Sequence, residues 1–114
     1  MPTVYTPIRK KNAGEVAKDA GLNANSTSSV GGSIYTGGAA SVTLQVVGVT
    51  GTHATHVVKL QGSVDNTNWT DTATTLTGNG AAVLSSPAYP YHRAKVTTAE
   101  GATSTIDTYV FARV

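Results

Sequence analysis

Apolar and polar residues alternate in short runs that recur from residue 30 to the C-terminus. Residues 42–46 show the pattern most clearly, because Val42, Leu44 and Val46 occupy one face and polar side chains occupy the other. Successive side chains of a β-strand point to opposite faces, so a period of two predicts a half-buried strand. The same pattern predicts further strands within residues 30–35, 56–64, 69–76, 82–84, 91–98 and 105–114.

Residues that favour turns separate these runs. Asp or Asn fills most of residues 65–68, and glycine flanks Asn79 on both sides. These residue types tolerate left-handed backbone, so both segments are expected to reverse the chain. Six or seven short antiparallel strands predict an all-β fold, an antiparallel two-sheet β-sandwich. Alternation does not specify strand order, so two sandwich topologies stay open, one jelly-roll-like and one immunoglobulin-like.

One face of each predicted strand is assigned to the core. In residues 56–64 the inward positions are Val58, Leu60, Gly62 and Val64, and the outward positions are Lys59, Gln61 and Ser63. The later strands add His92, Ala94, Val96, Ile106, Val110, Ala112 and Val114 to the expected core face.

Residues 1–29 lack the period of two and end in a polar stretch rich in Asn and Ser. We therefore expect an extended N-terminal arm over residues 1–29 and a β-sandwich domain over residues 30–114. Residues 14–21 have room for one or two helical turns, which are marginal without packing. Apolar side chains are spaced along the arm at Val4, Tyr5, Ile8, Val16 and Leu22. Two interpretations stay open, a strap that lies along another surface and a flexible terminus.

The composition favours β structure and excludes some chemistry. Thr and Ser supply 28 of the 114 residues, whereas charged residues make up only 12%. Threonine is β-branched and suits a half-exposed pleated surface. The absence of cysteine excludes disulfides, thiol catalysis and cysteine zinc sites. The N-terminus does not resemble a signal peptide and no long apolar run is present, so we expect a soluble protein with no membrane contact, made in the cytoplasm.

The net charge of +2 arises entirely in residues 1–19, and the rest of the chain is neutral overall. Residues 9–11 are three adjacent cations, a weak nucleic-acid signal, because strong binding uses about six or more phosphate contacts. We expect no nucleic-acid partner. A solvated arm, or one paired with an acidic neighbouring surface, is the preferred interpretation.

Metal and catalytic candidates are sparse. On a strand, His53 and His56 would point to opposite faces, and no other ligand lies nearby in sequence, so no metal is expected unless a turn covers position 53. The scattered candidates for acid–base work are Asp65, Asp71, His92, Glu100 and Asp107. Asp65 is explained by its turn, and Asp107 is expected to face solvent. No serine lies in a nucleophile elbow and no phosphate loop is present, so we expect neither enzyme activity nor a cofactor.

Trp69 is the single tryptophan and follows the turn of residues 65–68. The preferred interpretation is that it caps one end of the sandwich core. The alternative is a sugar-stacking platform, for which Tyr89 and Tyr91 are the available companions.

One segment has a recognisable motif. Residues 58–70 read Val-Lys-Leu-Gln-Gly-Ser-Val-Asp-Asn-Thr-Asn-Trp-Thr, and residues 91–97 and 104–107 extend the match. This pattern resembles the small β-sandwich proteins of tailed bacteriophage virions, in which a Leu-Gln-Gly-Ser…Asn-Trp hairpin is followed by a Tyr-to-Arg strand. The resemblance covers about residues 42–114 and leaves the arm unmatched. Similar patterns occur in capsid decoration proteins, neck and tail components, and fibre modules.

A small sandwich with an arm is most similar to capsid decoration (cement) proteins. The resemblance implies a viral structural protein on the outer capsid surface of the virion, which binds the assembled phage head and stabilises contacts between capsomers. The implied partners are the major capsid protein and further copies of the chain, as a homodimer or homotrimer. The implied capsid contacts lie in the arm, at Val4, Tyr5, Ile8, Arg9, Lys10 and Lys11. The alternatives are a carbohydrate-binding β-sandwich module of a phage fibre and a neck or tail subunit.

Overall fold

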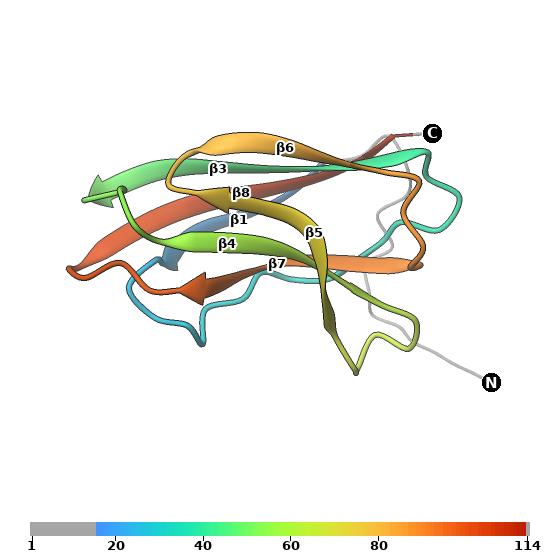
Figure 1. Cartoon of the computed structure of the whole chain (residues 1–114), viewed down its shortest axis with the longest axis horizontal. Helices are drawn as coiled ribbons and strands as arrows, with labels where there is room; N and C mark the ends of the chain where they lie inside the picture. Colours follow the sequence, from blue (N-terminus) through green and yellow to red (C-terminus); the bar gives the residue numbers. More distant parts are fainter. Residues whose placement is uncertain (1–15, 114) are drawn as a thin grey trace.

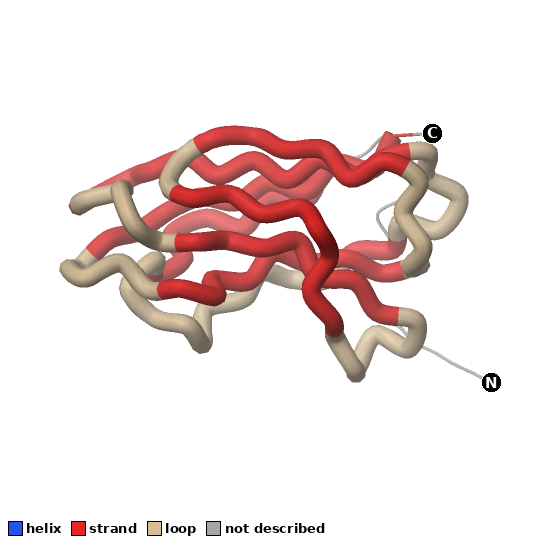
Figure 2. Tube along the Cα trace, in the orientation of Figure 1, coloured by secondary structure: helices blue, strands red, loops and turns tan. Residues whose placement is uncertain are grey.

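Eight strands and their connecting loops make up the part of the chain that the structure describes. A computed structural model describes residues 16–113, and no helix occurs among them (Figures 1 and 2). The strands are β1 (Val16–Asn23), β2 (Ile34–Tyr35), β3 (Ser41–Gly51), β4 (Val57–Ser63), β5 (Thr70–Thr77), β6 (Gly80–Ser85), β7 (Tyr91–Thr98) and β8 (Ser104–Arg113). Over these residues, nothing has the form of a membrane-spanning helix. The predicted all-β class is confirmed.

The strands form two antiparallel sheets of four. Sheet A has the order β1-β8-β3-β6, and sheet B has the order β2-β7-β4-β5. The first strand therefore pairs with the last, the second with the seventh, the third with the sixth and the fourth with the fifth. This nested order is one long hairpin wound into two layers, which is the eight-stranded jelly roll. Of the two sandwich topologies left open by the alternation, the strand order matches the jelly roll and not the immunoglobulin fold.

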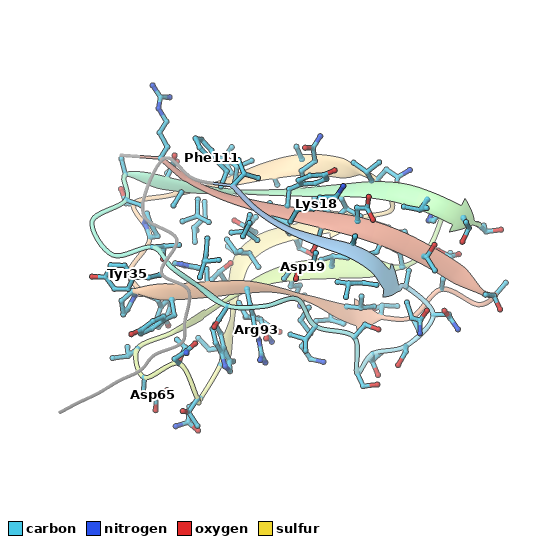
Figure 3. The ribbon with its side chains drawn as sticks, turned by 180° about the vertical axis from the view of Figure 1, so that it is seen from behind. Lys18, Asp19, Tyr35, Asp65, Arg93 and Phe111 are labelled. Atoms are coloured by element: carbon cyan, nitrogen blue, oxygen red, sulfur yellow. The ribbon has the colours of Figure 1, made fainter. Side chains whose placement is uncertain are left out.

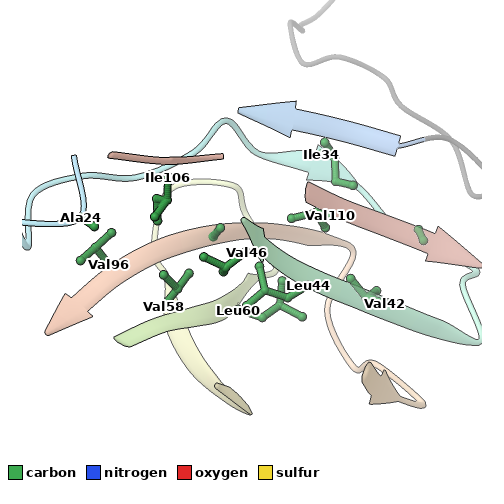
Figure 4. Close-up of a cluster of buried hydrophobic side chains, with 12 residues drawn as sticks. Ala24, Ile34, Val42, Leu44, Val46, Val58, Leu60, Val96, Ile106 and Val110 are labelled. Atoms are coloured by element: carbon green, nitrogen blue, oxygen red, sulfur yellow. The ribbon is translucent and has the colours of Figure 1, made fainter. Parts of the chain in front are cut away.

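The core lies between the two sheets and consists mainly of Val, Leu and Ile (Figure 4). Its buried members are Ala24, Ile34, Val42, Leu44, Val46, Val58, Leu60, Ala94, Val96, Ile106, Val110 and Ala112. Burying each Val, Leu or Ile contributes about 1.5–3 kcal/mol. The inward positions predicted on β7 and β8 are confirmed, except that Val114 lies outside the described residues.

The end of β4 departs from the predicted alternation. Val64 is 69% exposed because β4 ends at Ser63 and the chain then enters a turn. Gln61 and Ser63, predicted to be exposed on the outer side, are buried. The Gln61 side chain does point outward as predicted, but the side chains of Arg93 and Asp71 form hydrogen bonds with it and cover it. Alternation predicts where a side chain points, and its neighbours decide how much of it solvent reaches.

The boundary predicted at residue 30 is wrong. Residues 16–23 of the expected arm form β1, which pairs with β8 at the edge of sheet A. Ala24, immediately after β1, is fully buried in the core. The helical turns considered for residues 14–21 are not formed over residues 16–21. The described part of the sandwich therefore begins at residue 16.

A β-bulge interrupts the alternating pattern of β1, so the sequence does not reveal this strand. The pairing with β8 shifts register between Asp19 and Leu22, and Gly21 adopts a φ of 71°. An extra residue in a strand moves the inward positions from odd to even numbers, so the period of two is lost across the bulge. Both Ala17, before the bulge, and Leu22, after it, pack against the core.

Only the end of the strand predicted over residues 30–35 is regular. This end is β2, whereas Val30 forms an isolated bridge with Lys95 of β7. Between them the chain passes close to β1, and Gly32 N donates a hydrogen bond to Asp19 Oδ1 at 3.1 Å. The segment therefore covers the edge of β7 while Asp19 ties it to the other sheet.

Candidate functional site

A row of connected side chains crosses the outer face of sheet B. Alternation turns Gln61 on β4 and Arg93 on β7 away from the core, because their neighbours Leu60 and Ala94 are buried in it. Gln61 pairs in register with Arg93 on one side and with Asp71 of β5 on the other. We call Gln61, Trp69, Asp71 and Arg93 the Arg93 cluster. Figure 3 labels Arg93 on this sheet, on the far side of the molecule from Phe111 and Lys18 of sheet A.

Hydrogen bonds fix the row. Arg93 Nε donates to Gln61 Oε1 at 2.9 Å, and Gln61 Nε2 donates to Asp71 Oδ1 at 2.8 Å. Lys59 Nζ lies 3.6 Å from Asp71 Oδ2. The glutamine amide thereby uses one donor and its acceptor to orient a cation and an anion on neighbouring strands.

Trp69 completes the cluster by stacking with Arg93. The guanidinium carbon of Arg93 lies 4.3 Å from the centre of the Trp69 ring, within the range of a cation–π interaction. Among residues 16–113, no hydrogen-bond acceptor lies against the two terminal amino groups of Arg93, and only its Nε is bonded. Burial lowers the pKa of Arg93, yet a guanidinium remains charged at neutral pH.

The turn before Trp69 is held by Asp65. Its Oδ1 accepts hydrogen bonds from Asn68 N at 2.8 Å, Thr67 N at 2.9 Å and Ser63 Oγ at 3.0 Å, and its Oδ2 accepts one from Asn68 Nδ2. These donors, with the backbone N–H of Asn68 first, hold the pKa of Asp65 well below its usual range. The turn predicted from the Asn-rich sequence is confirmed, and Asp65 acts in it as a structural anion.

The prediction that Trp69 caps the end of the core is wrong. Its ring lies against Arg93 on the outer face of sheet B instead. Tyr89 is the aromatic residue that packs over the end of β4. Its ring lies against Gly62, where a Cβ would collide with it, and 6.3 Å from the ring of His92. Glycine at position 62 is therefore explained by the close approach of Tyr89.

Two further tyrosines belong to the outer face of sheet B. Tyr91 lies two residues before Arg93 on β7, so both side chains share this face. Tyr35 of β2 pairs with Tyr91 in register, and the two rings meet edge to face with centroids 5.6 Å apart. Aromatic groups therefore extend along the outer face from β2 to the start of β5.

The other end of the sandwich holds a cluster around Glu100, built from segments far apart in sequence. The Glu100 carboxylate accepts hydrogen bonds from the backbone N–H groups of Ala54, Thr55 and His56, from Thr55 Oγ1 at 2.9 Å and from His56 Nδ1 at 3.0 Å. Burial raises the pKa of Glu100, but these hydrogen bonds, led by the N–H of Thr55, outweigh burial and lower it to about 2. Glu100 therefore ties the β3–β4 loop to the β7–β8 loop.

The geometry predicted for the two histidines is wrong, since neither belongs to a strand. The rings of His53 and His56 lie edge to face with centroids 5.6 Å apart, because the loop between β3 and β4 turns them together. Within residues 16–113, no group of three His, Cys, Asp or Glu side chains has the geometry of a metal site. The His56 imidazole instead donates to Glu100, a contact between residues too far apart in sequence for spacing to reveal.

The other acid–base candidates lie apart, each with a partner of its own. Asp107 is partly buried, with Gly21 N donating to its Oδ1 and Lys18 Nζ 3.7 Å from its Oδ2, so the prediction that it faces solvent holds only in part. His92 is buried, joined through Nδ1 to Thr36 Oγ1 at 2.5 Å, and burial lowers its pKa to about 4.

The outer face of sheet A has a different chemistry. One register row crosses all four strands through Val16, Phe111, Thr43 and Val83, and the next passes through Lys18, Tyr109, Gln45 and Ala81. Val16 is 50% exposed and Val83 is 59% exposed. We call these two rows and the neighbouring Val47 the apolar face. It carries few charges and is backed by the rigid core.

The arm contacts predicted from the resemblance cannot be placed on either face. Val4, Tyr5, Ile8, Arg9, Lys10 and Lys11 all lie outside the described residues. The Arg93 cluster was not among the predicted sites, although the alternation on β4 and β7 indicates that Gln61 and Arg93 share a face. The pairing of these two strands, which joins them, has no signal in the sequence.

Comparisons with models of protein families, with curated proteins and with solved structures find no match for this chain.

Proposed function

We propose that this chain is a structural protein of a tailed-phage virion, which decorates the assembled head and clamps neighbouring capsomers. The observation that carries the proposal is the apolar face of sheet A. Exposed apolar side chains that gather on one rigid face mark protein interaction sites more often than scattered ones do. Of the seven large apolar side chains exposed within residues 16–113, four belong to strands of sheet A, namely Val16, Val47, Val49 and Val83.

The strand order supports this class of function without deciding it. Jelly rolls occur in viral capsid proteins and also in lectins and cupins, so the fold alone is an analogy. The resemblance of residues 58–70 to phage sandwich proteins favours the viral member of that group. The buried carboxylate Glu100 and the turn carboxylate Asp65 are both fully engaged in holding loops, which suits a structural role.

A clamp needs two contact surfaces on one small body. The apolar face of sheet A and the Arg93 cluster of sheet B lie on opposite sides of the sandwich and differ in chemistry. In this proposal the apolar face is the surface that contacts the major capsid protein. Symmetry repeats each contact over the shell, so modest single contacts add up through multivalency. Self-association as a homodimer or homotrimer belongs to the same proposal.

Co-sedimentation with phage heads assembled without this chain tests the proposal. Wild-type protein should pellet with the heads, and Val83→Lys should lower its occupancy at least tenfold because it places a charge in the apolar face. Val64→Lys is the matched control, since Val64 is exposed on a turn outside that face. Absence of wild-type protein from the pellet, or equal loss in both variants, contradicts the proposal.

The role of the arm needs a separate variant. Removal of residues 1–15 leaves β1 intact, whereas removal of residues 1–29 would also delete a strand of sheet A. If the arm contacts the capsid through residues such as Tyr5 and Ile8, the shorter truncation should weaken co-sedimentation. If the truncated chain binds heads as strongly as the full chain does, the proposed role of the arm is contradicted.

A carbohydrate-binding module is the second candidate, and the shared face of Trp69, Tyr91 and Tyr35 favours it. One face of the Trp69 ring is occupied by Arg93, which leaves less of the ring for a sugar. A glycan-array signal that disappears in Trp69→Ala would support this candidate over decoration.

A further inference from the structure

We propose that the Arg93 cluster is a carboxylate-binding site that receives an acidic, extended segment of a partner protein. The inference deepens the proposed function, on which the identity of that partner rests, by naming the chemistry of the second contact. The binding chemistry itself is independent of where the protein resides.

The Arg93 guanidinium is held ready for a planar anion. Its Nε donates to Gln61, and its guanidinium carbon lies over the Trp69 ring. These two contacts already restrict the position and orientation of the side chain. Gln61 is in turn held by Asp71. The terminal amino groups have no acceptor among the described residues, and two parallel N–H donors match the two oxygens of a carboxylate. Because the side chain is ordered before binding, less entropy is lost when the anion arrives.

Cations gather beside Arg93 on the same face. Lys59 and Lys95 are paired directly in register on β4 and β7, and like charges opposite each other are destabilising. Asp71 compensates Lys59, and Lys95 Nζ donates to the carbonyl of Thr27. Residues 16–113 carry equal numbers of cations and anions, yet three of the five cations lie on this face with a single carboxylate. An acidic ligand would relieve this concentration of positive charge.

The spacing of the cations indicates an extended peptide. Arg93 and Lys95 are two residues apart on β7, so their Cα atoms lie roughly 6.6 Å apart along the strand. Carboxylates at alternate positions of an extended partner segment have the same spacing. Acidic side chains at alternate positions would therefore reach Arg93 and Lys95 together.

Fluorescence anisotropy with a fluorescein-labelled (Glu-Thr)4 peptide tests the site, and (Gln-Thr)4 is the uncharged control. The full chain should bind the Glu peptide at least tenfold more tightly than the Gln peptide. Arg93→Lys keeps the charge but loses the planar fork, and should weaken binding of the Glu peptide about tenfold. Arg113→Lys makes the same exchange on β8, away from sheet B, and should leave binding unchanged.

Further variants and probes make each outcome decisive. Lys95→Gln should weaken binding severalfold, and it serves as the test if Arg93→Lys fails to fold. Equal affinity for the two peptides, or equal effects of the Arg93 and Arg113 exchanges, overturns the inference. Tighter binding of polygalacturonate than of (Glu-Thr)4 also overturns it, because the ligand would then be an acidic glycan.

Failure of the site and failure of the proposed function have different signatures. A chain that binds (Glu-Thr)4 through Arg93 but does not pellet with phage heads retains the site and contradicts the decoration role. A chain that pellets with heads but shows no preference for the Glu peptide overturns the site and retains the decoration role.

Discussion

Acid should destabilise this protein through the buried imidazole of His92. His92 is buried against Thr36 and Tyr89, and burial lowers its pKa from 6.5 to about 4. As the pH falls below 6.5, the unfolded chain binds a proton at this imidazole and the folded chain does not. The free energy of unfolding therefore falls between pH 6.5 and about 4, and the contribution of His92 becomes constant at lower pH.

The size of the effect follows from the shift. At about 1.4 kcal/mol per pKa unit, lowering the pKa from 6.5 to about 4 costs about 3 kcal/mol of stability across this range. A domain of this size has a total stability of about 5–15 kcal/mol, so the loss should be easily measured. Urea unfolding followed by the fluorescence of the single Trp69 supplies the free energy at each pH.

Two variants separate titration from packing. His92→Asn should remove most of this pH dependence, whatever it does to stability at neutral pH. Thr36→Val is the matched control. It removes the hydrogen bond between Thr36 and His92, worth about 1 kcal/mol, but keeps the titrating imidazole and hence the pH dependence. A pH dependence in His92→Asn as steep as in the wild type would refute the assignment to His92.

Three further predictions concern the packing and loop contacts. Glu100→Gln should abolish the loss of stability between pH 4.5 and about 2 that the lowered pKa of Glu100 predicts for the wild type, and melting temperatures across this range would show it. Leu44→Ala should cost about 2–5 kcal/mol in urea unfolding, whereas Val49→Ala, at an exposed position, should cost under about 0.5 kcal/mol. Gly62→Ala should cost roughly 1–3 kcal/mol because its Cβ meets the Tyr89 ring, and a strictly additive double variant with Tyr89→Ala would contradict that contact.

The sequence predicts the class of fold because most strands bury alternate side chains. Val42, Leu44 and Val46 on β3 alternate without interruption, and all three are buried. β1 was missed because the bulge near Gly21 shifts its inward positions by one residue. The order of strands within the sheets could not be predicted, because alternation reports which face is buried and not which strand lies alongside.

The candidate sites illustrate the same limit. The Asp65 turn is local, so its sequence was sufficient to predict it. The contact between Trp69 and Arg93 joins the turn before β5 to β7, and the contact between His56 and Glu100 joins two loops. Each depends on long-range pairing that a single sequence does not contain.

Cryo-electron microscopy of particles that carry this chain is the most direct test of the proposed function. We expect jelly-roll density on the outer surface of the head, bridging neighbouring capsomers, with the apolar face of sheet A against capsid protein and Arg93 beside an acidic segment. Density only at the neck, tail or fibre, or no density for the chain in the particle, would contradict the decoration role.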